Sequence, residues 1–199
     1  MTHGDTKASR DASGASRNDP GRRACLLGLG AALACGALPL RGALALGRLP
    51  ETRTLSFRSL HTEERLTATY LRDGRRDPGA LAEIDAILRD WRTEEVRPID
   101  PRLLDQLFAL RERLGSGGTF EIISGYRTPA TNAKLAAITD GVSRRSYHMR
   151  GMAIDIRLSD RKLTQVHEAA LRLRAGGVGL YTKSGFLHLD TGGVRTWGH

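Results

Sequence analysis

Two histidines and one aspartate have the types and spacing of a divalent-metal site. His148 and Asp155 lie seven residues apart with Gly151 between them, and His188 lies in a second apolar segment near the C-terminus. Gly151 would let the loop before a short strand fold back, so that His148 returns beside Asp155. An aspartate within the apolar run Ala-Ile-Asp-Ile is costly to bury unless a cation, either a metal ion or an arginine, pairs with it. Two imidazoles and one carboxylate would leave one position of a zinc ion open for water, as catalytic sites require.

Isolated histidines and aspartates also have simpler explanations. A lone histidine is more often a core or surface residue than a metal ligand, and we interpret His61, His167 and His199 in this way. Asp190 lies two residues after His188, so both side chains would share one face of a strand. Asp190 could also accept hydrogen bonds in the turn that follows it. Spacing by itself therefore supports the metal site only weakly.

The elements that would position these residues indicate the α+β class, with a small antiparallel sheet carrying the zinc site and packed against helices. Alternating and helical hydrophobic periodicity, together with Gly and Pro breaks, separates the elements. The expected strands cover residues 55–70 as a hairpin, 120–123, 153–156, and 178–181 with 186–190 as a second hairpin. The expected helices cover residues 80–92, 101–114, 131–138 and 164–174, the second beginning with Asp100 as N-cap and Pro101.

Residues 1–45 have the organisation of a secretory signal sequence. A polar, disordered start leads to Arg22 and Arg23, then to an apolar stretch at residues 24–40 and a small-residue exit at residues 43–45. The paired arginines resemble a twin-arginine export signal, which predicts cleavage near Ala45, a periplasmic location and no remaining membrane span. Two alternatives are an uncleaved membrane anchor and a lipoprotein attached through Cys35. The mature domain would then be residues 46–199.

Composition limits what the mature domain can do. Cys25 and Cys35 both lie in the signal segment, which excludes a disulfide framework and a thiolate zinc site from the mature domain. The net charge of +9 falls to +6 without the first 45 residues, which hold six basic and three acidic residues. An anionic cell-envelope polymer fits this charge as well as DNA does. The remaining basic residues form no long run and no recognition motif, so we expect no nucleic-acid partner.

Several motifs in a shared order resemble one known family. Ser-x-His-x-x-Gly-x-Ala-x-Asp at residues 146–155 and Phe-x-His-x-Asp-Thr-Gly at residues 186–192 are similar to the zinc D-Ala-D-Ala peptidases. Within that family they resemble the murein endopeptidase K-type branch. The resemblance covers roughly residues 50–197, and extends to the turn at 124–127, the run at 174–179, the terminal Arg195 and Trp197, and the twin-arginine leader.

The resemblance implies a small α+β fold of the type shared with lysostaphin-like and hedgehog-like domains. It also implies one zinc ion per chain. The implied ligands are His148, Asp155 and His188. Arg127 matches an arginine that steadies the substrate carbonyl or its developing oxyanion, although it could instead form a salt bridge that pins the turn at Tyr126. Ser146 would bind substrate backbone or cap its own loop.

The chain departs from the family pattern where a general base is expected. Many relatives carry an acid three residues before the last histidine, where this chain has Gly185. Others use a histidine two residues before it, where this chain has Phe186. Asp190 is our candidate for the base, and its alternative role is to orient His188.

The resemblance implies an endopeptidase that opens peptidoglycan cross-links, at bonds from D-Ala or diaminopimelate to diaminopimelate. A carboxypeptidase that trims terminal D-Ala would use the same zinc chemistry. The missing acid at Gly185 motivates a third possibility, a non-catalytic peptidoglycan-binding zinc module. We expect a monomer.

Overall fold

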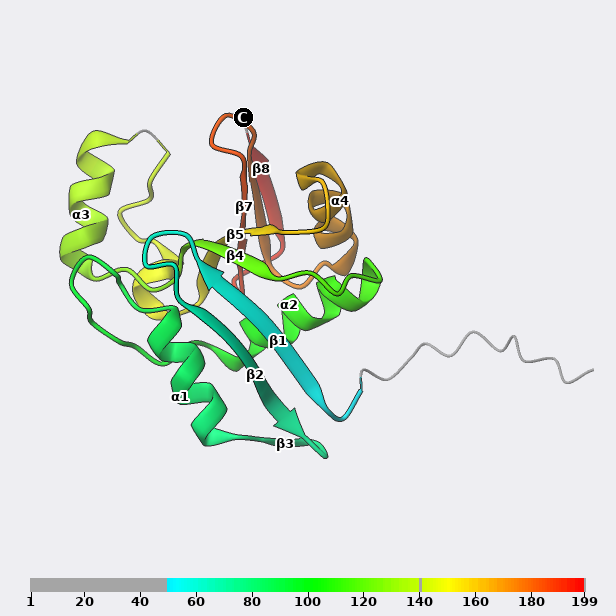
Figure 1. Cartoon of the computed structure of the whole chain (residues 1–199). Helices are drawn as coiled ribbons and strands as arrows, with labels where there is room; N and C mark the ends of the chain where they lie inside the picture. The colour runs from blue at the N-terminus through cyan, green and yellow to red at the C-terminus, as the bar shows by residue number, and fades with distance from the viewer. Residues whose placement is uncertain (1–49, 140, 199) are drawn as a thin grey trace, which may run out of the picture. The chain divides into compact units, whose positions relative to one another are not determined.

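The computed structural model describes residues 50–139 and 141–198, so the predicted signal sequence, both cysteines and His199 lie outside the described residues (Figure 1). The strands are β1 Arg53–Ser59, β2 Arg65–Arg72, β3 Arg75–Arg76, β4 Phe120–Ser124, β5 Ala153–Leu158, β6 Gly177–Tyr181, β7 Phe186–Asp190 and β8 Arg195–Gly198. The helices are α1 Pro78–Ile87, α2 Pro101–Arg113, α3 Pro129–Ile138, α4 Leu163–Leu173 and the 3₁₀ helix η1 Tyr147–Arg150. Among the described helices, none combines the length and the apolar character needed to cross a membrane.

The eight strands of the described residues join one sheet in the order β3-β2-β1-β4-β5-β7-β6-β8, and the predicted α+β class is confirmed. The sheet is mixed rather than wholly antiparallel, because β1 pairs with β4 and β6 pairs with β8 in parallel. The chain between β1 and β4 passes through a hairpin and two helices, which return it to the same end of the sheet. After β7, which is antiparallel to β6, the chain reverses once more, so β8 must run parallel to β6.

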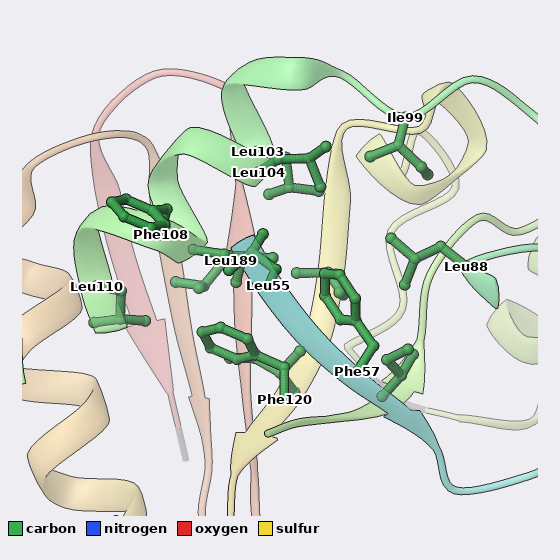
Figure 2. Packing of buried hydrophobic residues seen from close by; sticks show 14 of the residues in the cluster. Leu55, Phe57, Leu88, Ile99, Leu103, Leu104, Phe108, Leu110, Phe120 and Leu189 are labelled. Carbon is green, nitrogen blue, oxygen red and sulfur yellow. The ribbon is translucent and has the colours of Figure 1, made fainter. Parts of the chain in front are cut away.

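The hydrophobic core lies between one face of this sheet and the helices (Figure 2). Alternate residues of β5 and β7 enter it, because side chains of a strand point to opposite faces in turn. The helix α2 contacts β1 and α4, while α4 contacts β5, β6 and β7. The strand residues buried here include Leu55, Phe57, Phe120, Ile154, Ile156, Leu187 and Leu189, and α2 contributes Leu103, Leu104, Leu107, Phe108 and Leu110. Asp155, His188 and Asp190 therefore face the opposite side.

Helix α2 follows the sequence prediction, whereas α1 ends earlier than predicted. The carboxylate of Asp100 accepts the backbone N–H of Arg102 at 3.0 Å, as expected of an N-cap. The prediction for residues 80–92 was wrong at its end, since α1 stops at Ile87. The carbonyl of Leu88 accepts the N–H of Tyr126 at 2.7 Å. This bond joins the end of α1 to the turn that contains Tyr126. The carbonyl of Leu88 is therefore bonded to a residue far along the chain and not to a further turn of the helix.

Gly151 occupies a position that only glycine fits well. Its φ is +65°, and a Cβ there would lie 2.3 Å from the carbonyl oxygen of Pro98. We expect Gly151→Ala to lower the free energy of unfolding by roughly 2–4 kcal/mol, from left-handed strain and steric overlap together. Chemical denaturation measures this, with Gly117→Ala as control because a Cβ at Gly117 meets no atom within 4 Å. Equal unfolding midpoints for the two variants would contradict the prediction.

Candidate metal centre

Asp155 and His188 are direct neighbours across two strands. Asp155 on β5 lies opposite His188 on β7 in the antiparallel register. Both side chains point away from the core, because Ile154 and Leu187 beside them point into it. The register therefore brings together two residues that are 33 positions apart in the sequence.

His148 reaches the same point from η1, which precedes β5. The hydroxyl of Ser146 caps η1 by accepting the backbone N–H of His148 at 3.3 Å. The ring Nδ1 of His148 lies 2.6 Å from the carbonyl oxygen of Gly125, and a carbonyl only accepts, so Nδ1 carries the proton. The other ring nitrogen, Nε2, is left with a free lone pair that points to Asp155 and His188.

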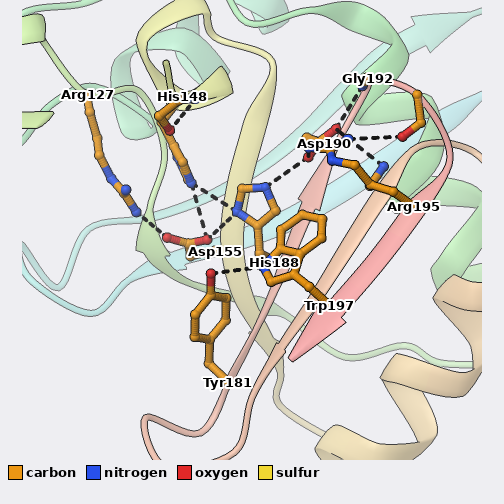
Figure 3. Close-up of polar contacts among 12 residues, drawn as sticks. Arg127, His148, Asp155, Tyr181, His188, Asp190, Gly192, Arg195 and Trp197 are labelled. Carbon is orange, nitrogen blue, oxygen red and sulfur yellow. Dashed lines mark hydrogen bonds and ion pairs between the residues drawn. The ribbon is translucent and has the colours of Figure 1, made fainter. Parts of the chain in front are cut away.

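The three side chains form a compact group that could hold a metal ion (Figure 3). His148 Nε2 lies 3.2 Å from Asp155 Oδ1 and 3.2 Å from His188 Nδ1, while His188 Nδ1 lies 2.8 Å from Asp155 Oδ1. One ligand atom from each residue lies within 4.8 Å of the others, and all three residues are buried. Imidazole nitrogens with a carboxylate oxygen suit a divalent transition metal. His61 and His167 lie outside this group.

The electrostatic environment keeps two of the candidate ligands in the protonation states that metal binding needs. Burial lowers the pKa of His148 to about 4, so its imidazole is neutral near pH 7. Burial alone would raise the pKa of Asp155, but interactions with His148 and Arg127 hold that pKa well below its usual value. Burial by itself would lower the pKa of His188, as it does for His148. Hydrogen bonds with Asp155 and Asp190 outweigh this effect, so the pKa of His188 is raised. A neutral imidazole beside an ionised carboxylate is ready to bind a cation.

Asp190 lies behind His188 rather than beside the three ligand atoms. Its Oδ2 is 3.1 Å from His188 Nε2, the ring nitrogen that faces away from Asp155. Arg195 donates to both carboxylate oxygens, at 2.6 and 3.0 Å, and the backbone N–H of Gly192 donates at 2.8 Å. The side chain is fully buried. This geometry favours the second role predicted for Asp190, which is to orient His188.

Arg127 makes its closest contact with the carboxylate of Asp155, one of the three residues that could hold a metal ion. Its Nη2 pairs with Asp155 Oδ2, and its Nε donates to the hydroxyl of Ser124 at 2.7 Å. The salt bridge weighed from the sequence is therefore present, with Asp155 as its partner. The oxygen of Asp155 that faces the histidines is the other one, Oδ1, so Arg127 holds the carboxylate by its far side.

The three candidate ligands line a pocket of about 470 Å³. Residues before η1, including Ser146 and Arg145, form part of its lining, and the β6–β7 hairpin contributes Tyr181 and Phe186. Arg127 lines it as well. Asp155 is the only carboxylate among the described residues that line the pocket.

Sequence reasoning did not assign functions to Tyr181 and Trp197, which also line the pocket. Trp197 belongs to β8, a strand too short and too polar to show a periodic pattern. The available signal was the alternation of Gly177 and Gly179 in β6, since glycine inside a strand often marks a close approach of another group. A Cβ at Gly179 would lie 2.5 Å from the indole of Trp197.

Comparisons with known proteins point to one family. The family model described as peptidoglycan L,D-endopeptidase MepK matches residues 48–197. The peptidoglycan L,D-endopeptidase MepK of Escherichia coli is 41% identical over 180 residues, which are 90% of this chain and 98% of the relative. The probable peptidoglycan L,D-endopeptidase MepK of Haemophilus influenzae is 40% identical over 169 residues, which are 84% of this chain and 90% of the relative. The chain therefore belongs to the peptidoglycan L,D-endopeptidase MepK family.

Proposed function

We propose that this protein is a zinc-dependent endopeptidase that cleaves peptide cross-links in peptidoglycan. The observation that carries the proposal is the group of His148, Asp155 and His188 within one pocket. Membership of the MepK family and the names of two relatives support the same substrate class. The bonds expected to break lead from D-Ala or diaminopimelate to diaminopimelate.

The residues fit one zinc ion per chain. Each ligand has an outer partner that fixes its orientation, as metal sites usually require: Gly125 O for His148, Arg127 for Asp155 and Asp190 for His188. When bound, zinc supplies polarisation of the scissile carbonyl and lowers the pKa of an attacking water to roughly 7.

The protein's own groups would hold and orient the substrate. Arg127 keeps Asp155 aligned and lines the pocket where a substrate carbonyl would enter. The hydroxyl of Ser146 accepts a bond from His148 N and so retains its own proton for a substrate carbonyl. Asp190 contributes by fixing the ring of His188, and we assign it no direct contact with the substrate.

Digestion of purified peptidoglycan sacculi tests the proposal. Zinc-loaded protein is expected to release uncrosslinked muropeptides, measured by liquid chromatography, and removal of the metal by a chelator should stop the release. Free D-Ala as the sole product would instead identify a carboxypeptidase.

One observation favours a second candidate, a non-catalytic zinc module that binds peptidoglycan. Among the described residues that line the pocket, no carboxylate other than Asp155 is present to act as a base. Zinc-loaded protein that cosediments with sacculi and releases nothing would establish this candidate and exclude the enzyme.

Export to the periplasm through a twin-arginine signal at residues 1–45 is part of the proposed function, because the substrate lies outside the cytoplasm. The mass of the protein recovered from the periplasm measures whether cleavage occurs near Ala45.

A further inference from the structure

A tyrosine and a tryptophan next to His188 form a polar pair that the metal site does not use. We propose that Tyr181 is a catalytic residue that donates a hydrogen bond to the scissile carbonyl oxygen as that oxygen becomes negatively charged. Trp197 is the positioning residue that aims it. This inference rests on the proposed function and adds to it a residue outside the predicted site.

The direction of the bond between the two residues leaves the tyrosine proton available. The indole Nε1 of Trp197 lies 3.0 Å from the hydroxyl oxygen of Tyr181. An indole N–H can only donate, so the hydroxyl of Tyr181 accepts this bond. Its own proton then remains for another acceptor, and the residue lines the pocket that holds the metal ligands.

The same contacts place the hydroxyl beside the metal ligands (Figure 3). The indole of Trp197 lies against the ring of His188, with centroids 5.2 Å apart, and its N–H bonds to Tyr181. The ring of Tyr181 stacks on Phe186 at 4.6 Å and 18°, which limits its rotation. In Figure 3 the hydroxyl of Tyr181 points toward Asp155 and His188.

The sheet is built to admit the indole at this position. Asp155, His188, Gly179 and Trp197 form one continuous row across β5, β7, β6 and β8. The row is open at Gly179, where a Cβ would lie 2.5 Å from the indole ring. The guanidinium of Arg195 lies 4.9 Å from the centre of the same ring and is itself held by Asp190. The indole is therefore fixed by contacts on more than one side.

Two of the arginines that line the pocket are committed to carboxylates. Arg127 pairs with Asp155, and Arg195 pairs with Asp190. A guanidinium that neutralises a neighbouring carboxylate is a weaker partner for a new negative charge. The hydroxyl proton of Tyr181, in contrast, takes no part in the hydrogen bond with Trp197. A preorganised donor of this kind contributes roughly 10²–10³-fold to turnover in other enzymes.

Tyr181→Phe removes the hydroxyl and keeps the ring stacked on Phe186. We expect kcat for release of muropeptides from sacculi to fall roughly 10²-fold, with KM changed less than about threefold, because the bond forms in the transition state. Bound zinc, measured by elemental analysis, should stay at one per chain. Tyr70→Phe is the matched control. The hydroxyl of Tyr70 on β2 bonds to Asp105 on α2, and both residues lie outside the pocket.

Trp197→Phe and Gly179→Ala test the positioning role. We expect each to lower kcat about tenfold in the wild-type background, and to have no further effect in the Tyr181→Phe background, since residues that act through one another are not additive. Equal losses in both backgrounds would assign Trp197 a separate, structural role and overturn this part of the inference.

A measurement on the metal-free protein tests the hydrogen bond without turnover. The chain has two tryptophans, so its ¹H–¹⁵N spectrum has two indole N–H resonances, and Trp197→Phe identifies which one belongs to Trp197. We expect this resonance to shift in Tyr181→Phe and to stay in place in Tyr70→Phe. An unchanged resonance in Tyr181→Phe would overturn the inference.

The outcomes separate this inference from the proposed function. Wild-type protein that binds zinc and cleaves sacculi, with Tyr181→Phe as active as the wild type, overturns the role of Tyr181 alone. Zinc-loaded wild-type protein that cleaves nothing overturns the proposed function, and the role of Tyr181 with it.

Discussion

His188→Ala is expected to abolish tight metal binding and to lower the release of muropeptides by at least about 10³-fold. Two ligands, His148 and Asp155, would remain, and a catalytic zinc site needs three protein ligands. Metal polarisation of a carbonyl lowers the barrier by several kcal/mol, and each 1.4 kcal/mol corresponds to about a factor of ten in rate. Zinc affinity by competition with a chelator and turnover on sacculi measure the two effects.

The matched control removes an imidazole elsewhere. His61 stacks on Trp91 and bonds to the carbonyl of Ile123, outside the pocket, so His61→Ala should keep both metal binding and turnover. Tight zinc binding by His188→Ala at wild-type affinity would mean that the ion is held somewhere else, and the proposed centre would be wrong.

Asp190→Asn is expected to weaken zinc binding roughly 10–100-fold, the usual effect of losing a partner that orients a metal ligand. The carboxylate receives N–H groups from His188, Arg195 and the backbone of Gly192. An asparagine of the same size would turn an amide N–H toward some of these donors. Turnover should fall at limiting zinc and recover when zinc is saturating, because the ligand itself remains.

This design distinguishes the two roles weighed for Asp190. A general base would be needed at every zinc concentration, so Asp190→Asn with wild-type zinc affinity and no turnover at saturating zinc would identify it as the base. Asp105→Asn is the matched control for lost ion pairs. Asp105 pairs with Arg53 and Arg76 and is outside the pocket, so its substitution should leave zinc affinity unchanged.

Local patterns in the sequence were sufficient for most individual elements. Helix α2 was predicted to within one residue at its C-terminal end, because its apolar periodicity and its cap at Asp100 are contained in neighbouring residues. Helix α1 was overextended to residue 92, because the bond that ends it comes from Tyr126, far along the chain. The strand β8 was missed, since its partner is β6 and its own four residues carry no pattern.

The candidate metal residues could also be named from the sequence, through motif resemblance and the cost of burying an aspartate among apolar neighbours. Their compact grouping follows from strand register, which places Asp155 opposite His188. The partner of Arg127 and the role favoured for Asp190 depend on which atoms of these side chains face each other. From its position in the strand alone, Asp190 could have been either the general base or the group that orients His188.

Residue types and their order along the chain were thus enough for the class of fold, the family resemblance and the candidate ligands, since these depend on short-range patterns and on chemistry carried by single side chains. Pairing between distant strands decided the rest: the mixed sheet, the row that joins Asp155 to Trp197, and the free proton of Tyr181. Register is set by the packing of the whole sheet, and a shift of one residue would turn each of these side chains to the other face.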